Sequence, residues 1–186
     1  TYQYPLYQQG LKACAQRRVA ADVGAHVGLF SFWMVRDFAQ VIAFEPVASH
    51  RECWTVNVPP RPQDQLHACA LGAKAGAVSM TTLVPSSSGG TCIAGLGTIP
   101  LHTLDSFDLP VLDLLKIDVE GYELEVLQGS VDTLVRCHPV CIVEQRPKQV
   151  AHMHHGPVDA VKFLQRLGAV VTWTDKRDYV LAWGRA

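Results

Sequence analysis

Acidic side chains follow two apolar segments near the start of this chain, and a glycine-rich turn lies between the segments. Asp22 stands near the end of the segment 19–23, residues 24–28 read Gly-Ala-His-Val-Gly, and Glu45 ends the next apolar segment, 41–44. Glycines let a backbone turn sharply and approach a ligand closely, and the first N–H groups of a helix are available to bind one. A carboxylate after the second strand suits the hydroxyls of a ribose. The pattern predicts a site for a nucleotide-type cofactor.

The glycine turn departs from the G-x-G-x-x-G pattern of dinucleotide-binding folds. His26 occupies the position of the second glycine, which makes room for a pyrophosphate, and Phe30 and Ser31 lie where the third would fall. Asp22 suits a ligand with a positive amino group, such as the methionine part of S-adenosylmethionine. The alternative is a glycine loop that only connects a strand to a helix. Glu45 at the expected distance favours the cofactor site.

Two later apolar segments also end in acids. Asp118 and Glu120 lie at the end of the segment 111–119, and Glu144 follows the segment 140–143. In an open parallel sheet the carboxyl ends of the strands lie on one edge, where ligands bind. A single acid at a strand end is usually a helix cap or an ion-pair partner, but several downstream of a glycine turn indicate a shared site.

The segments between these acids alternate between strand and helix patterns. We expect an α/β fold, a Rossmann-like doubly wound and mostly parallel seven-stranded sheet. By analogy of fold, a closing antiparallel hairpin is the layout of class I methyltransferases. The predicted strands are 19–23, 41–44, 66–71, 76–84, 99–104, 111–119 and 140–143, with a hairpin of 169–174 and 178–183. The predicted helices are 29–38, 48–58, 122–134 and 157–167, and a short one within 11–18.

The domain organisation follows from length and pattern. The 186 residues, 48% hydrophobic and 18% charged, predict a single globular domain over 19–186, preceded by an N-terminal segment, 1–18. That segment either packs over the cofactor or is the end of something longer. The loop 85–91 is either a surface turn or a mobile flap near the substrate.

Charge and hydropathy bound the partners. The formal net charge of −1 gives no general attraction for nucleic acid or anionic lipid. No apolar run approaches the roughly 20 residues that span a bilayer, and the start shows no secretory pattern. We therefore expect neither a membrane partner nor a nucleic acid partner, and the sequence does not indicate an oligomeric state.

The six cysteines and the histidine-containing loop 145–156 show no strong metal pattern. No pair forms C-x-x-C, and Cys69 and Cys141 fall in predicted buried strands, so apolar thiols are favoured over disulfides or zinc. This cysteine usage fits a reducing cytoplasm. His152, His154 and His155 predict an exposed loop, and no metal site is predicted from these residues.

Four motifs resemble those of the FkbM-type S-adenosylmethionine-dependent methyltransferases. They are DVGAHVG at 22–28, FEP at 44–46, ALG at 70–72 and LKIDVEGYE at 115–123. The likeness continues through LQG at 127–129 and Val143-Glu144, and it covers about residues 19–146. The K-I-D-V-E-G block is the most specific part. The resemblance implies methyl transfer to an oxygen, often a hydroxyl of a sugar or natural product.

The resemblance also implies roles for individual residues. The glycine turn would line the methionine part of the cofactor, the acid after the second strand would hold the ribose, and a later Ala-Leu pair would flank the adenine. His26 stands where the family more often has Asn, but it can still donate a hydrogen bond. The predicted cofactor-binding residues are Asp22, Gly24, Ala25, His26, Gly28, Glu45, Pro46, Ala70, Leu71 and Asp118.

The predicted chemistry needs a group that removes a proton from the acceptor hydroxyl. The hypothesis assigns this step to Asp118, with Glu120 or Glu144 assisting. The same carboxylates suit Mg²⁺, and the sequence does not choose between the two mechanisms. Glu120 beside Gly121 is equally suited to cap the following helix.

Other functions remain as alternatives. A nucleic-acid methyltransferase would carry an N/D-P-P-Y/F motif or a net basic balance, and the chain has neither. A non-catalytic module with the same fold could bind cofactor or a partner without turnover. An NAD-dependent enzyme ranks lower because of the glycine pattern.

Overall fold

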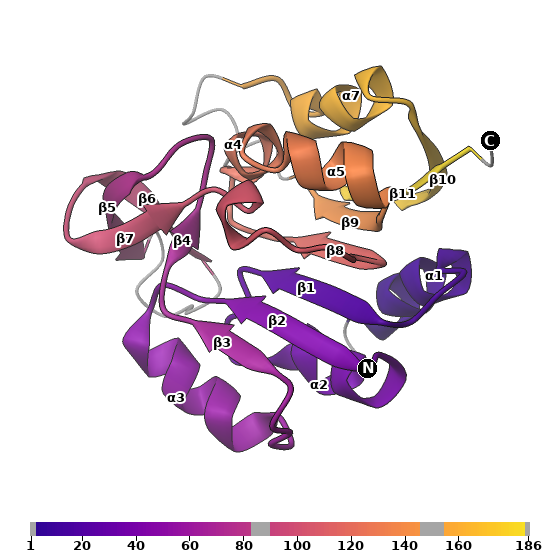
Figure 1. Cartoon of the computed structure of the whole chain (residues 1–186). Coiled ribbons are helices and arrows are strands. Elements are labelled where there is room, and N and C mark those ends of the chain that lie inside the picture. The colour runs from indigo at the N-terminus through magenta and orange to yellow at the C-terminus, as the bar shows by residue number, and fades with distance from the viewer. Residues whose placement is uncertain (1–2, 83–89, 146–154, 185–186) are drawn as a thin grey trace.

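Seven strands form one sheet in the order β10-β11-β9-β8-β1-β2-β3 (Figure 1). The computed structural model describes residues 3–82, 90–145 and 155–184. The pairs from β3 through β9 are parallel, and β11 runs antiparallel to both β9 and β10. This confirms the predicted seven-stranded, mostly parallel sheet with its closing hairpin. The strands are β1 Val19–Val23, β2 Gln40–Phe44, β3 Gln65–His67, β8 Leu114–Ile117, β9 Val140–Glu144, β10 Ala169–Asp175 and β11 Asp178–Trp183.

Helices cover both faces of this sheet, as a doubly wound fold requires (Figure 1). Side chains alternate along a strand, so Ala20 packs into the apolar cluster on one face and Ala21 into the cluster on the other. The first cluster includes α1 Tyr4–Ala13, α2 Leu29–Asp37 and part of α3 Ala48–Asn57. The second includes α4 Glu123–Gln128, α5 Val131–Cys137 and α7 Asp159–Arg166.

A second, four-stranded sheet follows β3, and the sequence did not predict it. Its order is β4-β7-β5-β6, and Figure 1 places it beyond the carboxyl ends of β1 and β2. The prediction of one strand over 66–71 is wrong, because the chain leaves the large sheet after His67 and then pairs with β7. The strands are β4 Ala70–Leu71, β5 Gly76–Thr82, β6 Thr91–Leu96 and β7 Ile99–His102.

Two helix predictions are also wrong. The expected helix 122–134 is broken into α4 and α5 at Gly129, where a Cβ atom would lie 2.0 Å from the carbonyl oxygen of Gly72. The N-terminal helix is α1, not 11–18. Pro5 in its first turn favours a start at Tyr4, and the Tyr7 hydroxyl donates to Asp37 at 2.7 Å. Most of the predicted loop 85–91 lies outside the described residues, and so do His152 and His154.

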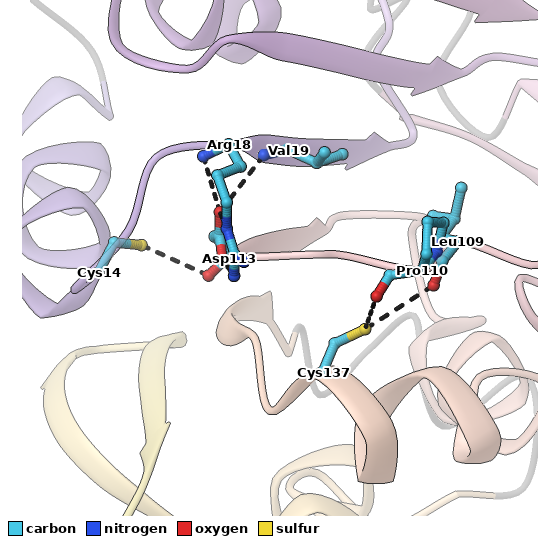
Figure 2. A network of polar contacts seen from close by, with 7 residues as sticks. All are labelled: Cys14, Arg18, Val19, Leu109, Pro110, Asp113 and Cys137. Carbon is cyan, nitrogen blue, oxygen red and sulfur yellow. Dashed lines mark hydrogen bonds and ion pairs between the residues drawn. The ribbon is translucent and has the colours of Figure 1, made fainter.

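Asp113 fixes the amino ends of β1 and β8, opposite the edge where the acids lie (Figure 2). Its carboxylate accepts from the Arg18 side chain at 2.6 and 3.1 Å and from the Arg18 backbone N–H at 2.7 Å. Burial opposes ionisation, but these bonds outweigh it and lower the pKa of Asp113. Cys14 donates to the Asp113 carbonyl, and Cys137 contacts the carbonyls of Leu109 and Pro110 (Figure 2).

The cysteines and the helices bear on two further expectations. Cys69 and Cys141 are both buried; Cys141 lies in β9 as predicted, whereas Cys69 lies between β3 and β4 and not in a strand. Each of the six cysteines carries a free thiol. Among the described residues, every helix is too short or too polar to cross a membrane.

Candidate active site

A cavity of about 340 Å³ lies at the carboxyl ends of β1, β2 and β8. The second sheet contributes to its wall through β4, β5 and β6. The predicted site residues that line it are Gly24, Ala25, His26, Glu45, Pro46, Ala70, Leu71, Asp118 and Glu120. Three others, Asp22, Gly28 and Glu144, are not part of the lining. The structure thus brings most of the predicted cofactor residues to one place.

The glycine turn after β1 is shaped by a close approach between strands. Gly24 has φ +73°, and a Cβ atom on it would lie 2.0 Å from the carbonyl oxygen of Asp118. The N–H groups of Gly24 and Ala25 both donate to the carbonyl of Phe44, at 3.0 and 3.1 Å. Gly28 serves packing instead, because a Cβ there would lie 2.6 Å from Val58. The turn can lie this close to the Asp118 backbone only because Gly24 has no side chain.

Glu45 lines the cavity and is held there by several polar contacts. Its side chain is buried, and one carboxylate oxygen accepts from the His26 backbone N–H at 2.8 Å. The other oxygen accepts from the Val47 N–H at 2.9 Å and lies 3.2 Å from Nδ1 of His50. These contacts tie the acid to the glycine turn and to α3. A carboxylate fixed in this way is suited to recognise a diol, because its orientation is set before a ligand binds.

A pair of histidines lies beside Glu45. The rings of His26 and His50 meet edge to face, with centroids 4.4 Å apart. Burial, with the neighbouring His50, lowers the pKa of His26. The His26 ring is therefore neutral near pH 7 and offers the cavity a hydrogen-bonding group without a charge.

Asp22 forms an ion pair, as expected for its charge, but its partner is a lysine of this chain and not a ligand. Its Oδ1 lies 3.1 Å from Nζ of Lys116, and its Oδ2 accepts from the Ser31 hydroxyl at 2.7 Å. Lys116 also donates to the Gly24 carbonyl at 2.7 Å. Burial disfavours the ammonium, but the carboxylates of Asp22, Asp118 and Glu45 outweigh it and raise the pKa of Lys116. Asp22 does not line the cavity, so its predicted contact with the cofactor has no support from the cavity geometry.

The acid pair after β8 sits on a tight turn. The Asp118 N–H donates to the Val23 carbonyl at 3.2 Å, which continues the pairing of β8 with β1. Glu120 and Gly121 then take φ values of +54° and +105°. Both Asp118 and Glu120 line the cavity, next to the glycine turn.

Glu144 is directed elsewhere. It is buried at the end of β9, and its Oε1 lies 2.6 Å from Nε of Arg177, in the turn between β10 and β11. This geometry matches the structural role of an acid at a strand end. Glu144 does not line the cavity, and its assignment as a catalytic residue stays a prediction.

Sequence reasoning missed several residues of the cavity wall. Lys116 carries a detectable signal, a charge inside an otherwise apolar strand. Met80 and Ile93 carry no such signal, because they reach the cavity only through the unpredicted second sheet. Gln3, just before α1, also lines the cavity, so the N-terminal segment does reach the site. Among the residues with described positions, no three His, Cys, Asp or Glu side chains are grouped so as to hold a metal ion.

Comparisons with known proteins find similarity to methyltransferases. A family model described as the methyltransferase FkbM domain matches residues 22–171. The hexuronic acid methyltransferase AglP of Haloferax volcanii is 26% identical over 181 residues, covering 92% of this chain and 72% of that protein. Similar solved structures include methyltransferase FkbM from Methylobacillus flagellatus, with a TM-score of 0.56, 14% identity, and coverage of 96% of this chain and 58% of that one.

A further similar structure contains a bound product-type ligand. It is the N-methyltransferase NodS of Bradyrhizobium japonicum in complex with S-adenosyl-L-homocysteine, with a TM-score of 0.51, 10% identity, and coverage of 96% of this chain and 82% of that one. At these identities the structural matches show the fold alone, which is Rossmann-like. The chain spans less than two thirds of the Methylobacillus protein and about 72% of the curated relative.

Proposed function

The chain belongs to the FkbM methyltransferase family, and we propose that it transfers the methyl group of S-adenosylmethionine to a hydroxyl of a sugar or another small molecule. One observation carries the proposal: the glycine turn, Glu45 and Asp118 all line a single cavity at the carboxyl edge of the parallel sheet. The name of the relative AglP, a hexuronic acid methyltransferase, supports a sugar-type acceptor.

The residues present fit this cofactor. Glu45, buried and fixed by two backbone N–H groups, would accept from the ribose hydroxyls. The turn at Gly24 and Ala25, which line the cavity, would hold the methionine part. Ala70 and Leu71, from β4, would flank the adenine. Asp22 acts behind the turn, because it holds the lysine that in turn holds the Gly24 carbonyl.

The chemical step asks little of the protein beyond alignment and proton removal. S-adenosylmethionine, when bound, supplies a methyl group already activated by a positive sulfur. The chain holds the acceptor hydroxyl in line with that methyl group and removes the proton of the hydroxyl. We assign the role of general base to Asp118, with Glu120 beside it, because these two acids line the cavity and Glu144 does not. The acid pair is therefore the centre of the proposed mechanism.

Calorimetric titration with S-adenosylhomocysteine and, separately, with NAD⁺ tests the cofactor. We expect binding of S-adenosylhomocysteine in the micromolar range (about −8 kcal/mol) and none of NAD⁺. Glu45→Ala should abolish the binding, whereas Glu52→Ala, an exposed acid on α3, should preserve it. Binding of NAD⁺, or equal affinity in the Glu45→Ala protein, would refute the proposed site.

An acceptor screen tests the reaction. Transfer of a radiolabelled methyl group from S-adenosylmethionine would be measured to neutral sugars and to hexuronic acids, each with and without added Mg²⁺. A product methylated on oxygen supports the proposal, and the comparison shows whether the carboxylates act as a base or through a metal ion. Binding of S-adenosylhomocysteine without transfer to any hydroxyl acceptor would favour a non-catalytic module.

A further inference from the structure

A buried acid outside the predicted site lies directly behind the acid pair. Glu123, at the start of α4, is 2% exposed. Its Oε1 accepts from the Gly121 N–H at 2.9 Å and from the Val119 N–H at 3.3 Å. One carboxylate oxygen thus binds two backbone groups of the turn that carries Asp118 and Glu120.

That turn needs support from outside itself. Glu120 has φ +54°, in the left-handed region that side chains other than glycine rarely adopt, and Gly121 follows at φ +105°. A backbone in this conformation persists only when surrounding contacts fix it. The two bonds to Glu123 are contacts of this kind, and they span the turn on both sides of Glu120.

Glu123 also connects the turn to the body of the domain. Its Oε2 accepts from the Gln145 side-chain amide at 3.4 Å, and the amide oxygen of Gln145 accepts from the Ala160 N–H of α7 at 3.1 Å. The Gln145 N–H is itself bound to the Arg177 carbonyl at 2.8 Å. The carboxylate therefore lies between the cavity turn on one side and β9 and α7 on the other.

The environment of Glu123 shows that the position is demanding. Burial, with a smaller contribution from the negative charge of Glu120, raises the pKa of Glu123 to about 7, although the hydrogen bonds from the turn lower it. Gln145, which directly follows β9, is neutral. Burial disfavours the charged form of this acid, and the hydrogen bonds that it accepts from the turn of the proposed active site explain its presence there.

We propose that Glu123 is a positioning residue, whose carboxylate holds the 118–121 turn so that Asp118 and Glu120 line the acceptor side of the cavity. The roles of Asp118 and Glu120 in this inference rest on the proposed function. The holding of the turn does not, since it follows from the hydrogen bonds alone.

Amide hydrogen exchange at Gly121 tests the holding of the turn. We expect Glu123→Ala to speed exchange of the Gly121 amide at least about tenfold, while amides within β1 keep their rates. Glu123→Gln, which retains one acceptor oxygen, should change it less than about threefold. The control is Glu125→Ala, which removes the other acid in the first turn of α4 and should leave Gly121 unchanged.

Turnover separates positioning from a purely structural role. With an acceptor from the screen, we expect Glu123→Ala to lower kcat at least about tenfold while KM for S-adenosylmethionine stays within about threefold, and Glu123→Gln to recover part of kcat. An unchanged Gly121 exchange rate in Glu123→Ala, or an unchanged kcat, would overturn the inference. If Glu123→Ala does not fold, Glu123→Met decides, because methionine fills the same space without an acceptor oxygen. We expect faster Gly121 exchange and a lower kcat in that protein, and wild-type values of both would overturn the inference.

The two proposals fail in different ways. A wild-type protein that does not bind S-adenosylhomocysteine contradicts the proposed function, yet Gly121 exchange still reports on Glu123. Normal binding with unchanged Gly121 exchange contradicts only the role of Glu123.

Discussion

Lys116 and Asp22 lie directly opposite each other on the parallel strands β8 and β1, with Nζ 3.1 Å from Oδ1. Both side chains are buried, and the same ammonium binds the Gly24 carbonyl. One ion pair thus joins the strand that carries the glycine turn to the strand that carries the acid pair. The two halves of the proposed site are held in register by residues 94 positions apart, by the numbering of the chain.

Removal of this lysine should strongly destabilise the fold. Lys116→Met leaves the Asp22 carboxylate buried without its cation, and we expect the free energy of unfolding to fall by about 3–5 kcal/mol. Lys162→Met is the control, because its ammonium is 3.8 Å from Asp159 and its side chain is 58% exposed. That change should cost less than about 1 kcal/mol. Urea unfolding measures both, and equal losses in the two proteins would contradict the role of the buried pair.

Substitution of Gly24 should damage the cofactor site. In Gly24→Ala the new Cβ meets the Asp118 carbonyl, and the φ of +73° is unfavourable for alanine. We expect S-adenosylhomocysteine to bind at least about tenfold more weakly, which is about 1.4 kcal/mol. Gly76→Ala, on β5, meets no atom within 4 Å and serves as the control. Calorimetric titration compares them, and unchanged affinity in Gly24→Ala would show that the turn tolerates a side chain.

Glu123 should make stability depend on pH. Its pKa of about 7 in the folded protein exceeds the ordinary value of 4.5, so the folded state binds the proton more tightly than the unfolded chain. Stability therefore decreases as the pH rises from about 4.5 to about 7, and the penalty is absent below that range. Glu123→Gln cannot ionise and should lack this decrease, which is about 3 kcal/mol for such a pKa difference.

Urea unfolding of both proteins at about pH 5 and about pH 8 measures this difference. Other ionisable groups affect the two proteins alike, so the comparison isolates Glu123. The same dependence on pH in the two proteins would mean that the carboxyl of Glu123 ionises normally.

Asp118 should be needed for turnover more than for binding. Asp118→Asn preserves size but removes the base, and we expect kcat to fall by roughly 10²–10⁴ with S-adenosylhomocysteine affinity within about threefold of the wild type. The exposed Asp108→Asn, in the segment before β8, is the matched control and should retain kcat. A methyl-transfer assay with an acceptor from the screen makes the measurement. Full turnover in Asp118→Asn would transfer the role of base to Glu120 or to a metal ion.

The sequence predicted what depends on local pattern. Short, mostly apolar segments such as 19–23 and 140–143 identified strands buried on both faces, and the glycine turn with Glu45 identified the cofactor edge of the sheet. Each of these signals lies within a few residues of the feature it predicts, because a strand, a turn and a strand end are set by neighbouring residues. The parallel sheet, the closing hairpin and most of the predicted cofactor-binding residues that line the cavity followed from such signals.

Tertiary contacts decided the rest. The helix expected over 122–134 is divided at Gly129, where the backbone lies against Gly72, and the second sheet contains the pairing of β4 with β7, some 30 residues away. Glu144 pairs with Arg177, whereas Asp22 pairs with Lys116. These outcomes depend on which distant side chains the packed sheet places together. The sequence pattern of an acid at a strand end is the same whether the acid binds a ligand or forms an ion pair within the chain. Its partner is therefore determined only by the register of the strands in the folded sheet.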